Sequence, residues 1–173
     1  MSRAEPAPRL PSPTPNFAPV IRPLQASDRA PLAELISRDG LFLADEVTCA
    51  LELIDAALAN PGADYLVRVA DVQGRIAGYV CFGPTPMTSG TWDLYWIATH
   101  PEFRGRGIAT FLIQHMEREL RARDARLVRV ETSHLDAYGS AHRFYVRTGY
   151  PEVARLPDFY RPGEDLIIML KRL

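Results

Sequence analysis

The sequence has little cysteine. Its 173 residues include only Cys49 and Cys81, which lie far apart within apolar stretches. This spacing excludes a disulfide framework and the paired cysteines of a zinc site. Two reduced thiols are typical of a cytoplasmic protein, so a cytoplasmic location is predicted.

Long apolar runs and an excess of one charge are also missing. No stretch approaches the roughly 18 consecutive apolar residues of a membrane span, so we expect a soluble protein without a membrane partner. The 20 Lys and Arg residues and 21 Asp and Glu residues give a formal net charge of −1. Proteins built to bind nucleic acid concentrate basic residues, so we predict no nucleic-acid partner.

Proline is unevenly distributed along the chain. Residues 1–17, MSRAEPAPRLPSPTPNF, hold five prolines and show no apolar run or periodicity. We therefore expect residues 1–17 to form a disordered, Pro-rich tail. Hydrophobic side chains make up 47% of the whole chain, enough for residues 18–173 to form one core and one domain.

Hydrophobic periodicity predicts the element order βααβββαβαββ. Strands are expected at 19–24, 65–71, 75–83, 91–99, 125–133, 150–159 and 165–173. Helices are expected at 28–40, at 44–60, from a glycine-rich junction to about 124, and at 137–149. A helix separates the fourth strand from the fifth, so these two strands should be parallel neighbours. The predicted fold class is α/β (α+β), with a mixed twisted sheet of about seven strands and four helices.

The junction between the fourth strand and the following helix is rich in glycine and arginine. It reads Arg104-Gly105-Arg106-Gly107-Ile108-Ala109. A helix N-terminus presents backbone N–H groups to an anion, and glycine lets a ligand approach the backbone closely. The six residues therefore form a candidate binding loop for a phosphate or pyrophosphate. A tight surface turn is the structural alternative, and neither a P-loop nor a G-x-G-x-x-G motif is present.

The same six residues resemble the [RQ]-x-x-G-x-[GA] pyrophosphate loop of the GNAT superfamily of N-acetyltransferases. The segment AHRFYVRTGY resembles the family's A-x-x-x-Y-x-x-x-G-[FY] pattern, with matching residues Ala141, Tyr145, Gly149 and Tyr150. The predicted element order is similar as well. Together these similarities cover roughly residues 20–173.

The resemblance implies acetyl-CoA as co-substrate, no metal, and a sheet that is splayed between strands four and five. Backbone groups beside that splay pair with the pantetheine arm in this family, which assigns Ile97, Ala98 and Thr99 to cofactor binding. Edge strands in this superfamily often pair into dimers, so a homodimer is one expectation for the assembly.

Acetyl transfer to an amine requires a base, because a free alkyl amine with a pKa of about 10.4 is mostly protonated at pH 7. Asp93 matches the position of the catalytic glutamate in histone-type members. Two-residue alternation predicts that it shares a face with Tyr95, Ile97 and Thr99. Glu131 resembles the strand-five base of ribosomal-protein N-terminal acetyltransferases. Both carboxylates are candidate bases.

The departing CoA thiolate needs a proton donor, and a phenol is a suitable one. Tyr145 matches the family's general acid through its spacing to Gly149 and Tyr150. Its structural alternative is packing in the core beside Phe144. Tyr138 stands where the family often has an asparagine, seven positions before Tyr145.

Three aromatic residues, Phe42, Trp92 and Tyr160, are predicted to bind the acceptor through cation–π contacts with a cationic amine. The resemblance implies direct attack on acetyl-CoA by a primary amine of a small molecule within a ternary complex. A protein N-terminal amine is the alternative acceptor, because Tyr160 resembles a tyrosine of N-terminal acetyltransferases. A non-catalytic acyl-CoA-binding regulatory module is the alternative class of function.

Overall fold

A computed structural model describes residues 18–38, 42–135 and 139–173. The Pro-rich segment 1–17, expected to be a tail, lies outside the described residues, and so does Tyr138. Among the helices of the described ranges, none combines the length and the apolar character needed to cross a membrane.

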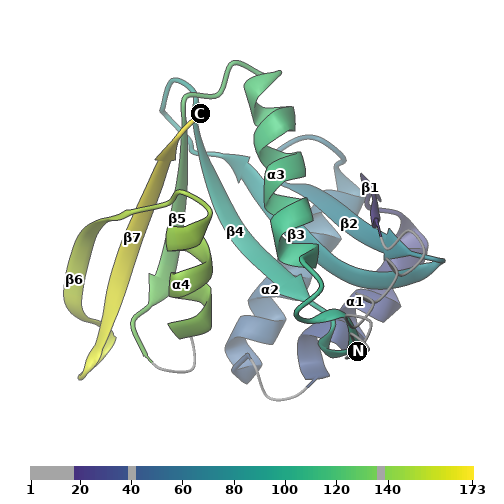
Figure 1. The fold of residues 1–173 in the computed structure, drawn as a ribbon, viewed down its shortest axis with the longest axis horizontal. Coiled ribbons are helices and arrows are strands. Elements are labelled where there is room, and N and C mark those ends of the chain that lie inside the picture. Colours follow the sequence, from purple (N-terminus) through teal and green to yellow (C-terminus); the bar gives the residue numbers. More distant parts are fainter. Residues whose placement is uncertain (1–17, 39–41, 136–138) are drawn as a thin grey trace, which may run out of the picture.

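Seven strands and four α-helices make up the described parts of the chain (Figure 1). The strands are β1 (Val20–Pro23), β2 (Leu66–Val72), β3 (Arg75–Pro84), β4 (Thr91–Thr99), β5 (Leu127–Ser133), β6 (Glu152–Arg161) and β7 (Glu164–Arg172). The helices are α1 (Arg29–Ser37), α2 (Ala44–Ala59), α3 (Ile108–Arg121) and α4 (Gly139–Arg147), with short 3-10 turns η1 (Ala26–Asp28) and η3 (Pro101–Phe103). The predicted order of strands and helices is confirmed.

One seven-stranded sheet runs in the order β1-β2-β3-β4-β5-β7-β6. The β4–β5 pair is parallel, as predicted from the helix between them, and the other pairs are antiparallel. Helix α3 supplies the crossover that a parallel pair requires.

Helices cover both faces of the sheet and divide the core in two. Helices α1 and α2 pack on one face, and α3 and α4 pack on the other (Figure 1). Helix α3 buries apolar residues at spacings of three and four, which form its core-facing stripe: Ile108, Leu112, Ile113, Met116 and Leu120. This packing fixes the direction of α3 and therefore the position of the junction at its N-terminus.

The third helix is shorter than predicted. It ends at Arg121 instead of near residue 124, because Asp124 takes a left-handed conformation with φ +56°. The Ala125 N–H donates to the Leu120 carbonyl at 3.0 Å, which closes the last turn of the helix.

Strands β4 and β5 form a fork. Their parallel pairing extends from Thr91 opposite Leu127 to Leu94 opposite Val130 and no further. Beyond Leu94 the two strands diverge, as Figure 1 shows. The remainder of β4 pairs with β3 alone, so its edge facing β5 carries backbone groups that a ligand can reach. The splay predicted between the fourth and fifth strands is confirmed.

A β-bulge in β4 overturns the predicted alternation of side chains. The register with β3 passes from Leu94 to Trp96, so Tyr95 is the extra residue. As a result Asp93 and Tyr95 face the α1 and α2 side, whereas Ile97 packs into the core beneath α3. The prediction that Asp93 shares a face with Ile97 and Thr99 is therefore wrong, because one inserted residue reverses the alternation.

Candidate active site

The glycine junction forms an open loop at the start of α3. Gly105 has φ +73° and Gly107, the N-cap of α3, has φ +80°. A Cβ added at Gly105 would meet no atom within 4 Å, and one at Gly107 would meet only the Phe111 ring, at 3.8 Å. The loop therefore combines left-handed backbone that favours glycine with free space above it.

The first turn of α3 provides the charge for an anion. The first N–H groups of a helix have no partner within the helix, and the helix dipole makes this end positive. The first turn of α3 contains no acidic residue. Ile108 is 1% exposed and packs in the core, while Arg104 and Arg106 lie exposed beside the loop.

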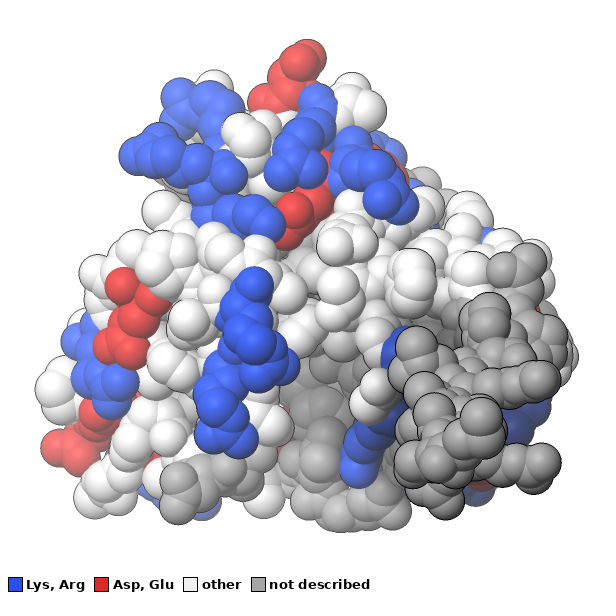
Figure 2. All heavy atoms as spheres, viewed as in Figure 1, with Lys and Arg blue, Asp and Glu red and all other residues white. Residues whose placement is uncertain are grey.

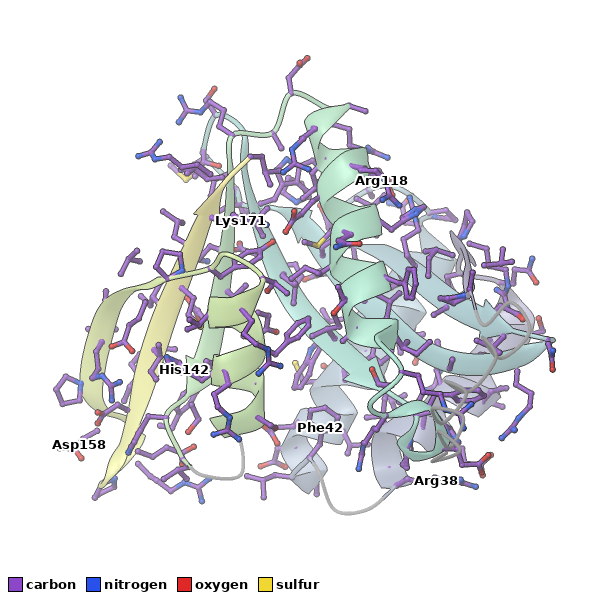
Figure 3. All side chains as sticks on the ribbon, viewed as in Figure 1. Arg38, Phe42, Arg118, His142, Asp158 and Lys171 are labelled. Atoms are coloured by element: carbon purple, nitrogen blue, oxygen red, sulfur yellow. The ribbon has the colours of Figure 1, made fainter. Side chains whose placement is uncertain are left out.

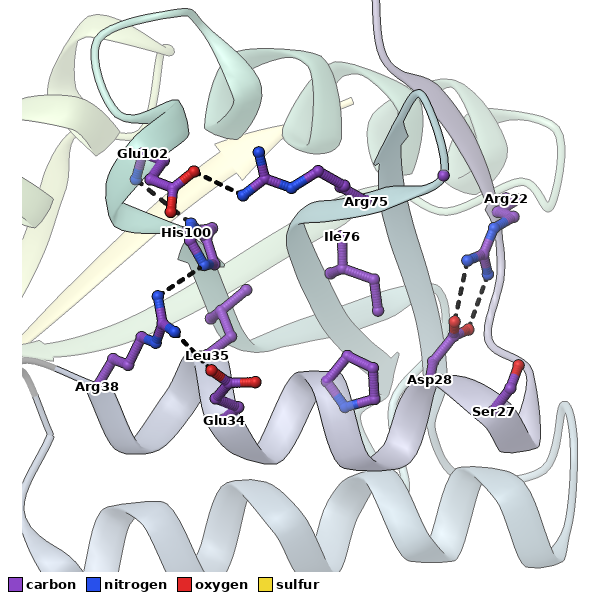
Figure 4. A pocket seen from close by; sticks show the side chains of 12 residues that line it. Arg22, Ser27, Asp28, Glu34, Leu35, Arg38, Arg75, Ile76, His100 and Glu102 are labelled. Atoms are coloured by element: carbon purple, nitrogen blue, oxygen red, sulfur yellow. Dashed lines mark hydrogen bonds and ion pairs between the residues drawn. The ribbon is translucent and has the colours of Figure 1, made fainter.

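A separate hollow of about 450 Å³ lies between α1 and the β2–β3 turn (Figure 4). Its three arginines already bind carboxylates: Arg22 with Asp28, Arg38 with Glu34, and Arg75 with Glu102. Such pairing leaves little positive charge for a phosphate. The loop at Gly105 and Gly107 is therefore the better anion site.

Asp93 is locked in place at the fork. Arg129, its partner across β4 and β5, donates from Nε to Asp93 Oδ1 at 2.6 Å. The Thr85 hydroxyl donates to Oδ2 at 2.8 Å. Asp93 is only 6% exposed, and both of its oxygens are engaged. Such a carboxylate is well placed to hold the fork together and poorly placed to collect a proton from an amine.

Glu131 lies on β5, two residues after Arg129, and is more exposed than Asp93. Its Oε1 is 3.4 Å from Arg129 Nη1, and its side chain is 42% exposed. Val128 and Val130 belong to the core beneath α3, so strand alternation directs Arg129 and Glu131 to the opposite face. Arg129 thus contacts both candidate bases, but it leaves Glu131 the freer of the two.

Tyr145 is a residue of α4, and its side chain packs in the core between the sheet and the helices α3 and α4. It is 5% exposed, and its ring centroid lies 5.4 Å from that of Phe144 and 6.0 Å from that of Tyr150. Burial raises the pKa of the Tyr145 phenol above its ordinary value. The hydroxyl therefore keeps its proton at neutral pH, which is the form that a proton donor requires.

A buried polar network holds the end of α4 next to Tyr145. Glu117 is 5% exposed and accepts hydrogen bonds from the Tyr150 hydroxyl at 3.0 Å and from Lys171 Nζ at 2.7 Å. Lys171 also donates to the Thr148 carbonyl at 2.7 Å. Gly149, with φ +90°, turns the chain out of α4 so that Tyr150 can enter the core.

Replacing Lys171 with methionine should destabilise the fold by about 3 kcal/mol, because it leaves the buried carboxylate of Glu117 without its closest cation. For a chain of this size the melting temperature should fall by roughly 6–12 °C in a calorimetric scan. Adding Glu117→Leu to Lys171→Met should restore most of the loss. If the double variant melts no higher than Lys171→Met, the cost does not come from an unpaired carboxylate.

The residues predicted to bind the acceptor are separated by the sheet. Phe42 (Figure 3) meets Trp96 edge to face, with ring centroids 5.3 Å apart, on the α1 and α2 side. Tyr160 is 46% exposed, and its pKa is raised by burial and then by nearby carboxylates, Glu131 foremost. Phe42, Trp96 and Glu131 thus share one face of the sheet, and Tyr160 lies close to Glu131.

Trp92 does not join them. It lies on the α3 side of β4. The centroid of its ring is 6.2 Å from the centroid of the Phe82 ring and 5.9 Å from the Arg123 guanidinium. The strand alternation that points Asp93 toward α2 necessarily points Trp92 away from it. Trp92 is therefore a packing residue in this structure, which corrects its predicted place in the acceptor site.

Comparison with known proteins identifies this arrangement. The family model described as "Acetyltransferase (GNAT) family" matches residues 31–150. The chain belongs to the GNAT acetyltransferase family. Among the described residues, no group of three or more His, Cys, Asp or Glu side chains is placed to hold a metal ion.

Two relatives are closely similar to this GNAT protein. An uncharacterized N-acetyltransferase from Methanocaldococcus jannaschii is 33% identical over 107 residues, which span 60% of this chain and 64% of the relative. A solved structure from Desulfovibrio desulfuricans, assigned to the GNAT family, is 35% identical with a TM-score of 0.84. That match covers 90% of this chain and 99% of the other.

More distant GNAT structures share the fold and differ in their acceptors. The ribosomal-protein-S18-alanine N-acetyltransferase from Escherichia coli is 23% identical, with a TM-score of 0.71 over 89% of this chain and 93% of that one. An aminoglycoside 6′-N-acetyltransferase complexed with coenzyme A is 18% identical, with a TM-score of 0.71 over 88% of this chain and 96% of that one. The common fold therefore leaves the acceptor open between small molecules and proteins.

Proposed function

We propose that this GNAT protein transfers the acetyl group of acetyl-CoA to a primary amine of a small molecule. The observation that carries the proposal is the open glycine loop at the start of α3, which lies on the same crossover as the fork between β4 and β5. Within the loop residues 104–109, the N–H groups of Arg104 and Arg106 donate to the Pro101 and Phe103 carbonyls, and the other backbone N–H groups hold the pyrophosphate. The pantetheine arm then pairs with the free edge of β4 at Ile97, Ala98 and Thr99.

The two substrates approach the fork from opposite faces of the sheet. Tyr145 lies on the α3 and α4 side, whereas Glu131 and Phe42 lie on the α1 and α2 side. Acetyl-CoA and the amine can then be bound at the same time, which favours direct attack within a ternary complex over an acetylated enzyme.

In this mechanism the amine nitrogen attacks the thioester carbonyl carbon. Glu131 takes the amine proton, directly or through a water, and a backbone N–H of β4 stabilises the oxyanion. The C–S bond then breaks, and Tyr145 gives its proton to the CoA sulfur. The products are an N-acetyl amine and free CoA, with the tyrosinate and the protonated Glu131 returned to their starting forms by solvent.

The face that contains Glu131 suits a cationic acceptor. Tyr160 lies near three carboxylates contributed by different elements: Glu131 on β5, Glu164 on β7 and Glu46 on α2. Together with the Phe42–Trp96 aromatic pair, these groups attract an ammonium ion by charge and by cation–π contact. A protein N-terminal amine is the second candidate acceptor, and the exposed Tyr160 on β6 is the feature that favours it.

A thiol-release assay with purified protein, acetyl-CoA and a panel of amines tests the proposal. The panel should contain mono- and diamines, amino sugars and short peptides with free N-termini. Turnover with small amines supports the proposal, and turnover with peptides alone supports the second candidate. Binding of acetyl-CoA without turnover of any amine would favour a non-catalytic acyl-CoA-binding module.

Glu131→Gln and Asp93→Asn form a matched pair, since each removes one charge beside Arg129. Glu131→Gln should abolish the rise of kcat with pH that a general base produces, while the affinity for acetyl-CoA stays the same. Asp93→Asn should instead lower stability by about 1–3 kcal/mol, because it disturbs a buried hydrogen-bonded carboxylate.

The readouts are kcat from pH 6 to 9 and the melting temperature. Loss of the pH-dependent rise in Asp93→Asn alone would make Asp93 the base. Wild-type profiles in both variants would mean that solvent deprotonates the amine.

A further inference from the structure

Five exposed arginines gather at one end of the molecule, where α3 and β7 end and β5 begins: Arg118, Arg121, Arg123, Arg126 and Arg172. We call this set the arginine surface. Figure 2 shows the basic side chains massed at the top of the view, and Figure 3 labels Arg118 and Lys171 at the same end. The Leu173 N–H donates to the Arg126 carbonyl at 3.0 Å, and Arg172 pairs with Leu127 across β5 and β7.

Of the acidic groups near this surface, Glu117 and Glu119 are paired with cations, and Asp124 is exposed between Arg123 and Arg126 in the chain. Glu117 is buried in the network with Lys171, and Glu119 accepts two hydrogen bonds from Arg68, at 2.8 and 2.5 Å. Arg123 bonds to the same Glu119 at 3.0 Å. Of the five arginines, Arg121 lies 3.6 Å from Glu117, and the side chains of Arg118, Arg126 and Arg172 contact no carboxylate of the described residues. The formal net charge of −1 therefore conceals a strongly cationic end.

Stability does not account for this arrangement. Cations in the last turn of a helix are stabilised by the helix dipole, which explains Arg118 and Arg121 on α3. Arg126 and Arg172 lie outside α3 and receive no such benefit. Like charges crowded together with few acidic partners destabilise a compact state, so a ligand is the better explanation for Arg126 and Arg172.

The shape of the surface favours an extended polyanion. Two hollows of the described residues lie elsewhere, one against α1 and one against His134 and His142. The largest group of exposed large apolar side chains lies on β6, so the arginine surface has little of the apolar centre that a protein interface requires. Guanidinium groups bind phosphates through two parallel hydrogen bonds. We propose that the arginine surface binds nucleic acid through its phosphate backbone, without reading the base sequence. The prediction of no nucleic-acid partner rests on the net charge of the whole chain, which does not describe this end.

This binding would leave the proposed active site open. Strands β4 and β5 both start at the arginine surface and run toward the fork. The nine residues of β4 span roughly 30 Å at about 3.3 Å per residue. Nucleic acid on the arginine surface should therefore change neither the affinity for acetyl-CoA nor the turnover of a small amine, so the inference stands apart from the proposed function.

The test measures fluorescence anisotropy of a labelled 20-nucleotide poly(U) RNA, and of the matched DNA, with the full chain. If about four phosphates are neutralised, the dissociation constant should rise about 50-fold between 50 and 200 mM salt. The variant Arg118→Gln/Arg126→Gln/Arg172→Gln should bind at least about tenfold more weakly at 50 mM salt. Its log–log salt slope should be smaller by about 2.

A matched control removes the same charge from other faces of the molecule: Arg38→Gln/Arg143→Gln/Arg155→Gln. This control should bind like the wild type. Equal losses in both triple variants, or no loss in either, would overturn the inference. A competition experiment compares poly-L-glutamate with unlabelled RNA at the same concentration of charge. If the two compete equally well, the inference is overturned in favour of an acidic protein partner.

Discussion

Replacing Tyr145 with phenylalanine is expected to lower turnover about 100-fold or more, while the affinity for acetyl-CoA stays nearly the same. The substitution keeps the ring between Phe144 and Tyr150 and removes only the hydroxyl. Burial keeps that hydroxyl protonated at neutral pH, so it is in the form that can donate to the developing CoA thiolate. The measurements are kcat from thiol release and the dissociation constant from calorimetry.

Tyr79→Phe is the matched control for this variant. Tyr79 is also fully buried, but its hydroxyl finds no hydrogen-bond partner and it lies in the core on the α1 and α2 side. Its removal should leave turnover unchanged. An acetyl thioester whose leaving thiol has a lower pKa should partly rescue Tyr145→Phe. Wild-type turnover in Tyr145→Phe would refute the general-acid role and leave Tyr145 as a packing residue.

Gly107→Glu is expected to abolish the stabilisation that acetyl-CoA gives to the wild type. Saturating acetyl-CoA at about 100 times its dissociation constant should stabilise the native state by about 2.7 kcal/mol and raise the melting temperature. A glutamate at Gly107 would place a side chain and a negative charge in the open space above the loop. The ligand-induced shift in melting temperature should then disappear.

Gly62→Glu separates this effect from backbone strain. Gly62 has φ +84°, close to the φ +80° of Gly107. A Cβ at Gly62 would meet no atom within 4 Å, and one at Gly107 would meet only the Phe111 ring. Both variants should therefore lose similar stability without ligand, but Gly62→Glu should keep the full shift with acetyl-CoA. A full shift in Gly107→Glu would remove the loop from the cofactor site.

Much of the fold could be predicted because it depends on local patterns. The helical spacing of α3, the alternation in the strands and the crossover between β4 and β5 are all visible in the sequence. The glycine loop was predictable for the same reason, since its geometry depends on residues that are neighbours in the chain. The error at the end of α3 is local as well, and arises from the left-handed turn at Asp124.

Features that depend on pairing between distant segments were not predictable. The bulge at Tyr95 exists only in the register between β3 and β4, so sequence alternation assigned Ile97 and Thr99 to the wrong face. The contact between Arg129 and Asp93 requires the β4–β5 register, which decides how free each carboxylate is. Periodicity alone cannot supply that register.

The division of the proposed site between the two faces of the sheet has a consequence for how acceptor choice can change. The elements beside the acceptor face, the start of α2 and the β6–β7 hairpin, share no residue with the loop at Gly105 and Gly107. Substitutions at Phe42 or Tyr160 can therefore be selected in a laboratory library for a new amine while the donor half remains intact. The protein is in this sense two separable modules, and retargeting it to another acceptor would require mutating only one of them.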